Sequence, residues 1–334
     1  MKKAAVFGVG ANFFRYEGEM RKTYEICCLG DNNRTKWGGT YKGLEILSVD
    51  RLKNENFDCV LVPATAGKME IMNSLLEAGI PCEKIIPWFH GEGRLWKEKE
   101  VIYQGNNLCR ARFDDLRFAC RNSFELAVVQ EVYFDNEYGC GLGGSKNDVV
   151  VIDIGMNVGL TALFLARFAQ VKAVYGFEPF PHICEKALEN IGMNDDVIKN
   201  KIFAKNVGLS NYEGTEYFSH DSMHTLNPLE AKSNEQKDEV KIVKAGREIK
   251  DIIHKNPGKK ILVKIDVEGQ EYNIFEEFDK ENIIADIDVF MIETHLGREE
   301  ELKSLLAKNG FVYFAQNNSV YTDLGMMYAV NMKH

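Results

Sequence analysis

The stretch VVVIDIGMNVG at positions 149–159 decides the fold of the second half of the chain. Residues 149–154 are apolar on both faces except for Asp153, which predicts a buried strand in a parallel sheet covered by helices. Gly155 and Gly159 follow, and glycine lets a backbone turn pass close to a ligand. An apolar helix, LTALFLARF, is expected at 160–168. A strand, a glycine turn and a helix in this order are typical of an open α/β sheet, which binds ligands at the carboxyl ends of its strands.

The position of the next acidic residue indicates a nucleoside ligand. The following strand, AVYGF at 173–177, ends at Glu178, which lies 19 residues after Gly159. A carboxylate there can accept hydrogen bonds from both hydroxyls of a ribose. The glycine spacing is GxNxG and not GxGxxG, so the close approach that a pyrophosphate needs is not provided. S-adenosylmethionine fits, because its carboxylate could use N–H groups near the helix start and its ammonium could bind Asp153. The alternative is a purely structural strand, turn and helix.

Four segments carry a more specific signal: VIDIGMNVG (151–159), GFEPFP (176–181), NVGLSNYEGTEYF (206–218) and LVKIDVEGQE (262–271). In this combination and order the sequence resembles the FkbM family of S-adenosylmethionine-dependent methyltransferases, over residues 145–295. The resemblance implies a class I methyltransferase fold, which is an α/β fold with a Rossmann-like, mostly parallel sheet of seven strands and an antiparallel last strand. Met156 and Gly208 stand where the family often has alanine, and neither change removes a charge.

The residues and the resemblance together predict the cofactor site. Its members are Asp153, Gly155, Asn157, Gly159, Glu178, Pro179 and Val207. We expect Glu178→Ala to weaken cofactor binding markedly and to leave the protein folded, because a carboxylate at the edge of a sheet is not part of the core.

The predicted catalytic residues are Asp266, Glu268 and His295, which lie at or just after the ends of the strands ILVKID (261–266) and DVFMIE (288–293). Carboxylates could anchor the cofactor or the acceptor hydroxyl, and a histidine can accept a proton near neutral pH. The alternatives are an internal ion cluster around Lys264 and a structural histidine. The segment SHDSMHTLNP (219–228) contains two histidines and an aspartate, His220, Asp221 and His224. Its proline and polar residues favour a loop and not the helix that such ligands need, so we predict no metal site.

The remaining pattern completes the sheet. A strand is expected at KIFAKNV (201–207), and FVYFA (311–315) and MMYAV (326–330) lack a helix between them, which predicts an antiparallel pair. Residues 219–258 are polar and predict a loop, a short strand and a helix outside the core sheet. Such insertions commonly carry substrate contacts.

The N-terminal ninety residues predict a small Rossmann-like domain of their own. Short apolar strands are expected at 4–9, 24–29, 59–63 and 84–87, with a helix over 69–80. Gly8 and Gly10, followed by Asp31, suggest a dinucleotide site, but Phe13 stands where the third glycine is needed. We therefore prefer a structural turn. The segment is similar to small Rossmann-like domains fused to bacterial sugar-modifying enzymes, which implies a regulatory or partner-binding part.

Three parts follow from these patterns: a Rossmann-like domain at 1–90, a helical connector at 91–148 and the methyltransferase domain at 149–334. In the connector, a helix is expected from Phe113 to Phe134, followed by the glycine-rich stretch 139–144, which is typical of a hinge or surface loop.

Composition excludes several classes of protein. The formal charge of −9 disfavours nucleic-acid binding, which needs clustered Lys and Arg. No stretch approaches the roughly 20 apolar residues of a membrane span, and the N-terminal apolar run is too short for a secretory signal. The eight cysteines form no CxxC and lie mostly in apolar runs, which favours reduced thiols in the cytoplasm.

The leading hypothesis is an S-adenosylmethionine-dependent O-methyltransferase that acts on a hydroxyl of a sugar, a glycan or a natural product. Two alternatives remain: an NAD(P)-linked sugar oxidoreductase or epimerase that uses the first glycine turn, and a non-catalytic partner protein that binds S-adenosylmethionine. A homo-oligomer formed through the N-terminal domain is compatible with the leading hypothesis.

Overall fold

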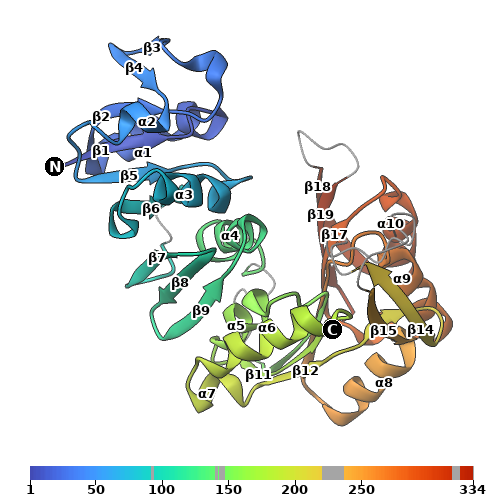
Figure 1. The fold of residues 1–334 in the computed structure, drawn as a ribbon. Coiled ribbons are helices and arrows are strands. Elements are labelled where there is room, and N and C mark those ends of the chain that lie inside the picture. The colour runs from blue at the N-terminus through green and yellow to red at the C-terminus, as the bar shows by residue number, and fades with distance from the viewer. Residues whose placement is uncertain (92–93, 140–141, 143–146, 220–236, 318–323, 334) are drawn as a thin grey trace. The chain divides into compact units, whose positions relative to one another are not determined.

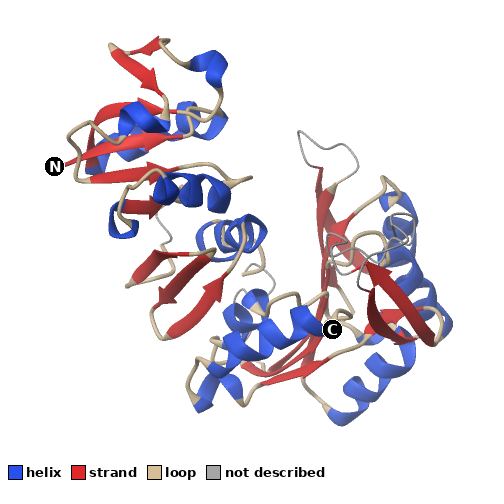
Figure 2. Ribbon diagram, in the orientation of Figure 1, coloured by secondary structure: helices blue, strands red, loops and turns tan. Residues whose placement is uncertain are grey.

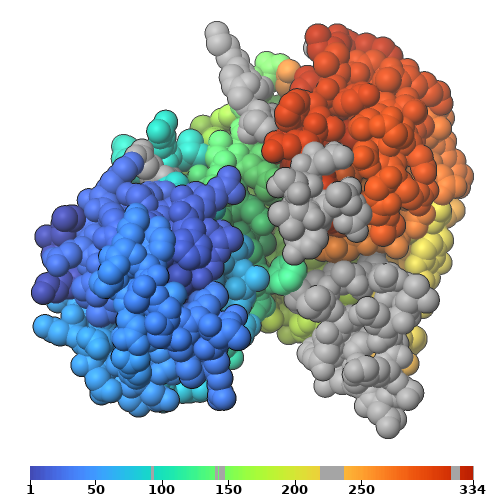
Figure 3. Space-filling view, turned by 90° about the horizontal axis from the view of Figure 1, so that it is seen from above, coloured from blue at the N-terminus to red at the C-terminus, as the bar shows by residue number. Residues whose placement is uncertain are grey.

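The computed structural model describes residues 1–91, 94–139, 142, 147–219, 237–317 and 324–333. The chain divides into two compact units, Met1–Glu137 and Tyr138–His334. Figure 1 traces both units from blue at the N-terminus to red at the C-terminus. In the space-filling view of Figure 3, the colour of the first unit runs from blue to green, and the later part of the second unit is orange to red.

The first unit contains a six-stranded sheet of order β3-β4-β2-β1-β5-β6. Its strands are β1 (Lys2–Phe7), β2 (Tyr24–Gly30), β3 (Thr40–Tyr41), β4 (Leu44–Leu47), β5 (Cys59–Val62) and β6 (Ile85–Pro87), and its helices are α1 (Ala11–Thr23), α2 (Val49–Leu52) and α3 (Lys68–Glu77). Phe13 and Met20 of α1 pack on apolar residues of β1, β2 and β5. The four strands and the helix expected from the sequence are therefore present.

The prediction of a helical connector at 91–148 is wrong. This segment forms an antiparallel sheet of β7 (Lys99–Gly105), β8 (Leu108–Phe113) and β9 (Leu116–Cys120), and only then the helix α4 (Ser123–Val129) and a π-helical turn (Gln130–Phe134). In β8, Cys109 and Ala111 are buried, whereas Arg110 and Arg112 are exposed. This alternation with a period of two is typical of a strand with one face exposed to solvent. The prediction of a helix from Phe113 did not take it into account.

The same segment packs with the first unit, so the boundary lies at 137/138 and not at 90 or 148. The backbone N–H of Met69 in α3 donates to Ser123 Oγ at 2.8 Å, and the hydroxyl of Tyr103 in β7 donates to Asn73 Oδ1 at 2.7 Å. A chain cut at residue 90 would lose both contacts. The smallest second unit that the structure supports therefore begins at Tyr138.

The second unit is built on a seven-stranded sheet of order β12-β11-β10-β16-β17-β19-β18. The strands are β10 (Val149–Ile154), β11 (Val171–Phe177), β12 (Ile202–Lys205), β16 (Lys260–Ile265), β17 (Val289–Thr294), β18 (Phe311–Asn317) and β19 (Gly325–Asn331). All neighbours pair in parallel except β17 with β19 and β18 with β19, which are antiparallel. The mostly parallel sheet with an antiparallel end is confirmed.

Helices and a small sheet surround this framework, as Figure 2 shows by secondary structure. The helices are α5 (Leu160–Ala166), α6 (Pro181–Gly192), α7 (Asp196–Lys199), α8 (Ala245–Lys255), α9 (Glu271–Lys280) and α10 (Glu299–Lys308). The small sheet consists of β13 (Gly208–Ser210), β14 (Gly214–Ser219) and β15 (Lys237–Lys244). The predicted strand and helix within 219–258 correspond to β15 and α8. Among the described residues, no helix is long and apolar enough to cross a membrane.

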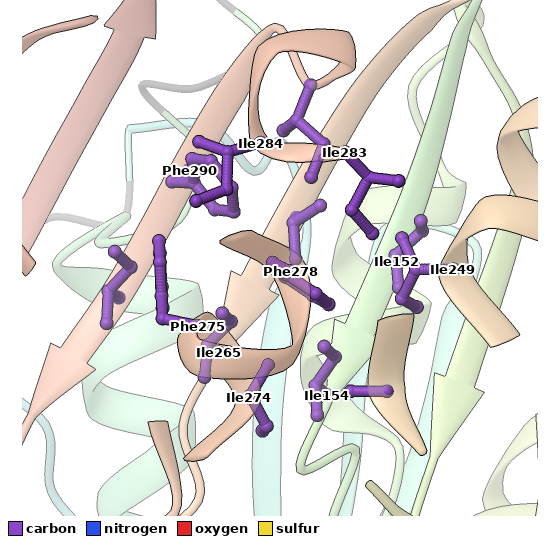
Figure 4. Packing of buried hydrophobic residues seen from close by; sticks show 14 of the residues in the cluster. Ile152, Ile154, Ile249, Ile265, Ile274, Phe275, Phe278, Ile283, Ile284 and Phe290 are labelled. Carbon is purple, nitrogen blue, oxygen red and sulfur yellow. The ribbon is translucent and has the colours of Figure 1, made fainter. Parts of the chain in front are cut away.

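One face of the seven-stranded sheet forms the main apolar core. Ile152, Ile154 and Ile265 point to this face and pack among residues of α8, α9 and α10, as Figure 4 shows for Ile249, Phe275 and their neighbours. Each such fully buried side chain contributes about 1.5–3 kcal/mol relative to an exposed one. Since successive side chains of a strand alternate between faces, the residues between them project to the opposite face. Those residues include the charged ones.

Candidate cofactor and active site

The turn after β10 lies against the ends of two neighbouring strands. The N–H groups of Gly155 and Met156 both donate to the carbonyl oxygen of Phe177, at 3.0 and 2.9 Å. Gly155 has φ of +79°, and a Cβ atom there would lie 1.8 Å from the carbonyl oxygen of Asp266. No side chain fits in that space. Glycine at this position is therefore required for β10, β11 and β16 to end together.

The rest of the turn is closed by its own hydrogen bonds. Asn157, with φ of +52°, donates its N–H to Glu178, and its Oδ1 accepts the N–H of Val158 at 2.7 Å. Gly159, with φ of +81°, donates to the carbonyl of Met156 and begins α5. The N–H groups of residues 155–159 are thus all engaged. The N–H groups near the helix start that could face the carboxylate of a cofactor are therefore those of the first turn of α5, which begins at Leu160.

Glu178, directly after β11, is a buried carboxylate and not a surface group. Its Oε2 accepts the N–H of Asn157 at 2.9 Å, and its Oε1 accepts the N–H of Phe180 at 3.0 Å. Burial raises the pKa of Glu178 to about 7, and the two backbone hydrogen bonds oppose this increase. The premise of the Glu178→Ala prediction, that this carboxylate is not part of the core, is therefore wrong. Alanine would leave two N–H groups without their acceptor, so we expect this variant to fold but to be less stable than the wild type.

The raised pKa of Glu178 predicts a pH dependence of stability. The folded protein holds this proton more tightly than the unfolded chain, whose glutamate has the usual pKa of 4.5. The contribution is fully present below pH 4.5 and is lost as the pH rises to about 7. Linkage sets its size on the order of 3 kcal/mol. Urea unfolding of the wild type and Glu178→Gln from pH 4 to 8 should show the difference between their unfolding free energies shrinking with pH. A constant difference would refute the assignment.

The other predicted cofactor residues flank Glu178. Asn206 Nδ2 donates to the carbonyl oxygens of Glu178 and Pro179, at 2.9 and 3.0 Å, and so ties the end of β11 to the chain after β12. Val207 follows directly, and its partly buried side chain packs against the main core. Pro179 and Val207 therefore belong to the same strand ends as Glu178.

A buried ion cluster lies between β10 and β16. Asp153 and Lys264 are paired across the two strands, and Lys264 Nζ lies 3.3 Å from Asp153 Oδ1 and 3.5 Å from Asp266 Oδ2. The ammonium also donates to the carbonyl of Gly155 at 2.7 Å. Burial opposes the charge of Lys264, but the two carboxylates outweigh it and raise its pKa. The internal ion cluster considered from the sequence exists.

Asp153 retains unused hydrogen-bonding capacity within this cluster. It is fully buried, its Oδ1 faces Lys264 Nζ at 3.3 Å, and among the described residues neither carboxylate oxygen has a partner in good hydrogen-bond geometry. Burial raises its pKa, and the charge of Lys264 counteracts that increase. Buried polar atoms without partners are rare in native proteins. Asp153 therefore has the capacity to accept a cationic donor from a ligand.

The three predicted catalytic residues come together beyond β16 and β17. One ligand atom each of Asp266, Glu268 and His295 lies within 4.8 Å of the others. His295 Nε2 is 3.4 Å from Glu268 Oε2. Burial raises the pKa of Glu268, and His295 opposes this. The structure thus brings these three side chains to the same edge of the sheet as Gly155.

Glu271, at the start of α9, is a further member of the site that sequence analysis missed. It is fully buried, its Oε1 accepts the N–H of His295 at 2.7 Å, and its Oε2 accepts the N–H of Gly269 at 2.8 Å. Its Oε1 also lies 3.4 Å from His295 Nδ1. Burial lowers the pKa of His295, but Glu271 and Glu268 outweigh it and raise that pKa to about 9. The sequence contained one indication of this role: Glu271 is the last residue of LVKIDVEGQE (262–271), one of the segments that resemble the FkbM family.

The glycine turn of the first unit does not present a free ribose acceptor. Asp31 Oδ2 accepts the N–H of Val9 at 2.8 Å and the ammonium of Lys36 at 2.7 Å, and its Oδ1 accepts the N–H of Asn33 at 2.8 Å. The carboxylate that an NAD site would use thus already accepts three hydrogen bonds, one of them from an ammonium that neutralises its charge, whereas Glu178 accepts two and has no such partner among the described residues. His220, Asp221 and His224 lie outside the described residues.

The strand order of the second unit, its glycine turn and its acidic strand ends define an α/β methyltransferase fold of class I. Residues 153–313 match the family model described as Methyltransferase FkbM domain, and residues 1–86 match the one described as C2185-like, N-terminal. The chain therefore carries an FkbM methyltransferase domain preceded by a separate N-terminal domain. Among curated proteins, none matches the sequence.

Three solved structures that are similar to this chain cover different shares of its length. Methyltransferase FkbM from Methylobacillus flagellatus is 13% identical and covers 98% of this chain and 90% of its own, with a TM-score of 0.41. TYW2 from M. jannaschii, in complex with AdoMet, is 13% identical and covers 69% and 88%, with a TM-score of 0.37. UDP-D-quinovosamine 4-dehydrogenase from Vibrio fischeri is 24% identical and covers 26% and 78%, with a TM-score of 0.22.

Proposed function

We propose that the protein uses S-adenosylmethionine to methylate a hydroxyl oxygen of a sugar, a glycan or a natural product. The observation that carries this proposal is the pair of buried carboxylates, Asp153 and Glu178, on either side of the tightly packed Gly155 turn. Two acids at the carboxyl ends of neighbouring parallel strands suit a ligand that carries an ammonium and a ribose.

The site fits such a cofactor in its donors and acceptors. Each carboxylate oxygen of Glu178 accepts one backbone N–H and has a second lone pair for a ribose hydroxyl. Asp153 has unused acceptor atoms for the ammonium. When bound, the cofactor supplies a methyl group on a positively charged sulfur. The protein's task is to hold the acceptor oxygen in line and to take its proton.

The acceptor side is provided by the cluster beyond β16 and β17. Asp266 and Glu268 are the carboxylates that take the hydroxyl proton and pass it to solvent. His295, with a pKa of about 9, already holds a proton at neutral pH and orients Glu268 through their 3.4 Å ion pair. In the overall reaction the acceptor oxygen gains the methyl group and loses a proton, and the sulfur keeps the electron pair of the broken bond.

Calorimetry with the full chain tests this proposal. We expect S-adenosylhomocysteine to bind at one site per chain and NAD to give no heat of binding. Labelled S-adenosylmethionine with a panel of sugars and hydroxylated natural products should then yield an O-methylated product, which mass spectrometry and NMR identify. Binding of NAD alone would favour an oxidoreductase, and an N-methylated or C-methylated product would overturn the choice of oxygen.

A further inference from the structure

A second ligand-binding feature lies within the cluster of Asp266, Glu268 and His295. These residues belong to two different loops, after β16 and after β17, yet one ligand atom of each lies within 4.8 Å of the others. Asp266 is half-buried, Glu268 is exposed and His295 is buried. Two carboxylates and an imidazole that converge from separate segments form a donor set suited to a metal ion.

The imidazole of His295 is presented in the way typical of a metal ligand. The residue is 6% exposed, and its Nδ1 makes no hydrogen bond in the part of the chain that the structure describes. Nδ1 faces the buried carboxylate of Glu271 at 3.4 Å, whereas Nε2 faces the cluster. A histidine that binds a metal almost always has a carboxylate or carbonyl behind its other nitrogen, which fixes the tautomer and the ring. Two backbone N–H groups hold Glu271 in that place.

We infer that Asp266, Glu268 and His295 bind one divalent transition-metal ion, with Glu271 as the positioning residue of His295. Bonds of about 2.0–2.2 Å would bring such ligands to roughly 3–4 Å from one another, so the cluster must contract slightly. Glu268 is the side chain free to do so, since it is exposed. Lys264 Nζ lies 3.5 Å from Asp266 Oδ2, and we assign Oδ1 to the ion. The mixed nitrogen and oxygen donors favour manganese, iron or zinc over magnesium.

Three protein ligands leave coordination positions open for an acceptor. This role rests on the proposed function: an acceptor hydroxyl and a neighbouring oxygen would occupy the open positions, and the ion would lower the pKa of the hydroxyl. With the ion bound, the two carboxylates and a deprotonated His295 act as its ligands. The hydroxyl then loses its proton directly to solvent, in place of the carboxylate base, and gains the methyl group. The substrate class that this geometry selects is a compound with two adjacent oxygens, such as a vicinal diol of a sugar.

Titration of the full chain with Mn²⁺, followed by the loss of the free-ion EPR signal, tests the site without cofactor or acceptor. We expect one ion per chain, and at least tenfold weaker binding in Asp266→Asn, Glu268→Gln and His295→Gln. Glu271→Gln should weaken binding about 10–100-fold although Glu271 is not a ligand, because it positions His295. Asp251→Asn, an exposed aspartate on α8, is the matched control and should bind as the wild type does.

The outcomes separate this inference from the proposed function. Weak binding that is equal in the wild type and the Asp266 and Glu268 variants overturns the metal site, and these two positions are exposed enough to test it even where His295→Gln fails to fold. Parallel calorimetry with S-adenosylhomocysteine tests the cofactor site. If S-adenosylhomocysteine binds but Mn²⁺ does not, only the metal inference is refuted. If Mn²⁺ binds but S-adenosylhomocysteine does not, only the proposed function is refuted.

Discussion

Gly155→Ala is expected to destabilise the second unit by at least about 3 kcal/mol and to abolish binding of S-adenosylhomocysteine. The new Cβ would lie 1.8 Å from the carbonyl oxygen of Asp266, which belongs to the backbone and has no flexible end to move aside. The positive φ of +79° adds a cost of about 1–2 kcal/mol for any residue other than glycine. The loss is measured by urea unfolding and calorimetry of the full chain.

Gly192→Ala provides the matched control in the same unit. Gly192 ends α6, and a Cβ there would meet nothing within 4 Å. Alanine favours a helix over glycine by about 1 kcal/mol, so this variant should be as stable as the wild type or slightly more stable. If Gly155→Ala unfolds with the same midpoint as the wild type, the close packing of the turn against β16 is refuted.

Glu178→Gln is expected to weaken binding of S-adenosylhomocysteine by about 2 kcal/mol, which is roughly a thirtyfold loss of affinity. The amide keeps one acceptor oxygen, but its NH₂ group must face one of the two N–H donors, from Asn157 or Phe180. A ribose would thus lose a charged acceptor and find the remaining oxygen displaced. Calorimetry at pH 8 measures the effect where the wild-type carboxylate is ionised.

Glu185→Gln is the control for the change of charge. Glu185 is exposed on α6, in the same unit, and its substitution should leave the affinity unchanged. Thermal unfolding of both variants checks that the fold survives. An affinity of Glu178→Gln within twofold of the wild type would remove Glu178 from the cofactor site.

The sequence predicts the sheet of the second unit well because its signals are local. The short β-branched run at 149–154, followed by a glycine turn, favours a buried parallel strand, and the absence of a helix between residues 315 and 326 favours an antiparallel pair. The sequence analysis did not predict the strands β7 to β9, because arginines and aromatic residues obscured their alternation of buried and exposed positions. The exposed residues of β8 are Arg110 and Arg112, and arginine by itself does not distinguish a strand from a helix.

The sequence indicated which residues lie at the strand ends of the candidate site, but not how deeply they are buried or which groups they contact. Asp153, Glu178 and Asp266 follow from their places at strand ends, but nothing in the sequence reveals that Glu178 is buried and bonded to two N–H groups. Such bonds depend on where a distant turn folds back. Glu271 escaped for a related reason, since its partner His295 lies 24 residues further along the chain.

The contact between Gly155 and the carbonyl of Asp266 also has a mechanical consequence. Lys264 joins the same two places, since its ammonium donates to the Gly155 carbonyl and pairs with the Asp266 carboxylate. In the proposed function the turn faces the cofactor and Asp266 faces the acceptor, and these two segments are in direct contact. A displacement of the Gly155 turn would therefore be transmitted to Asp266, and a displacement of Asp266 would be transmitted to the turn.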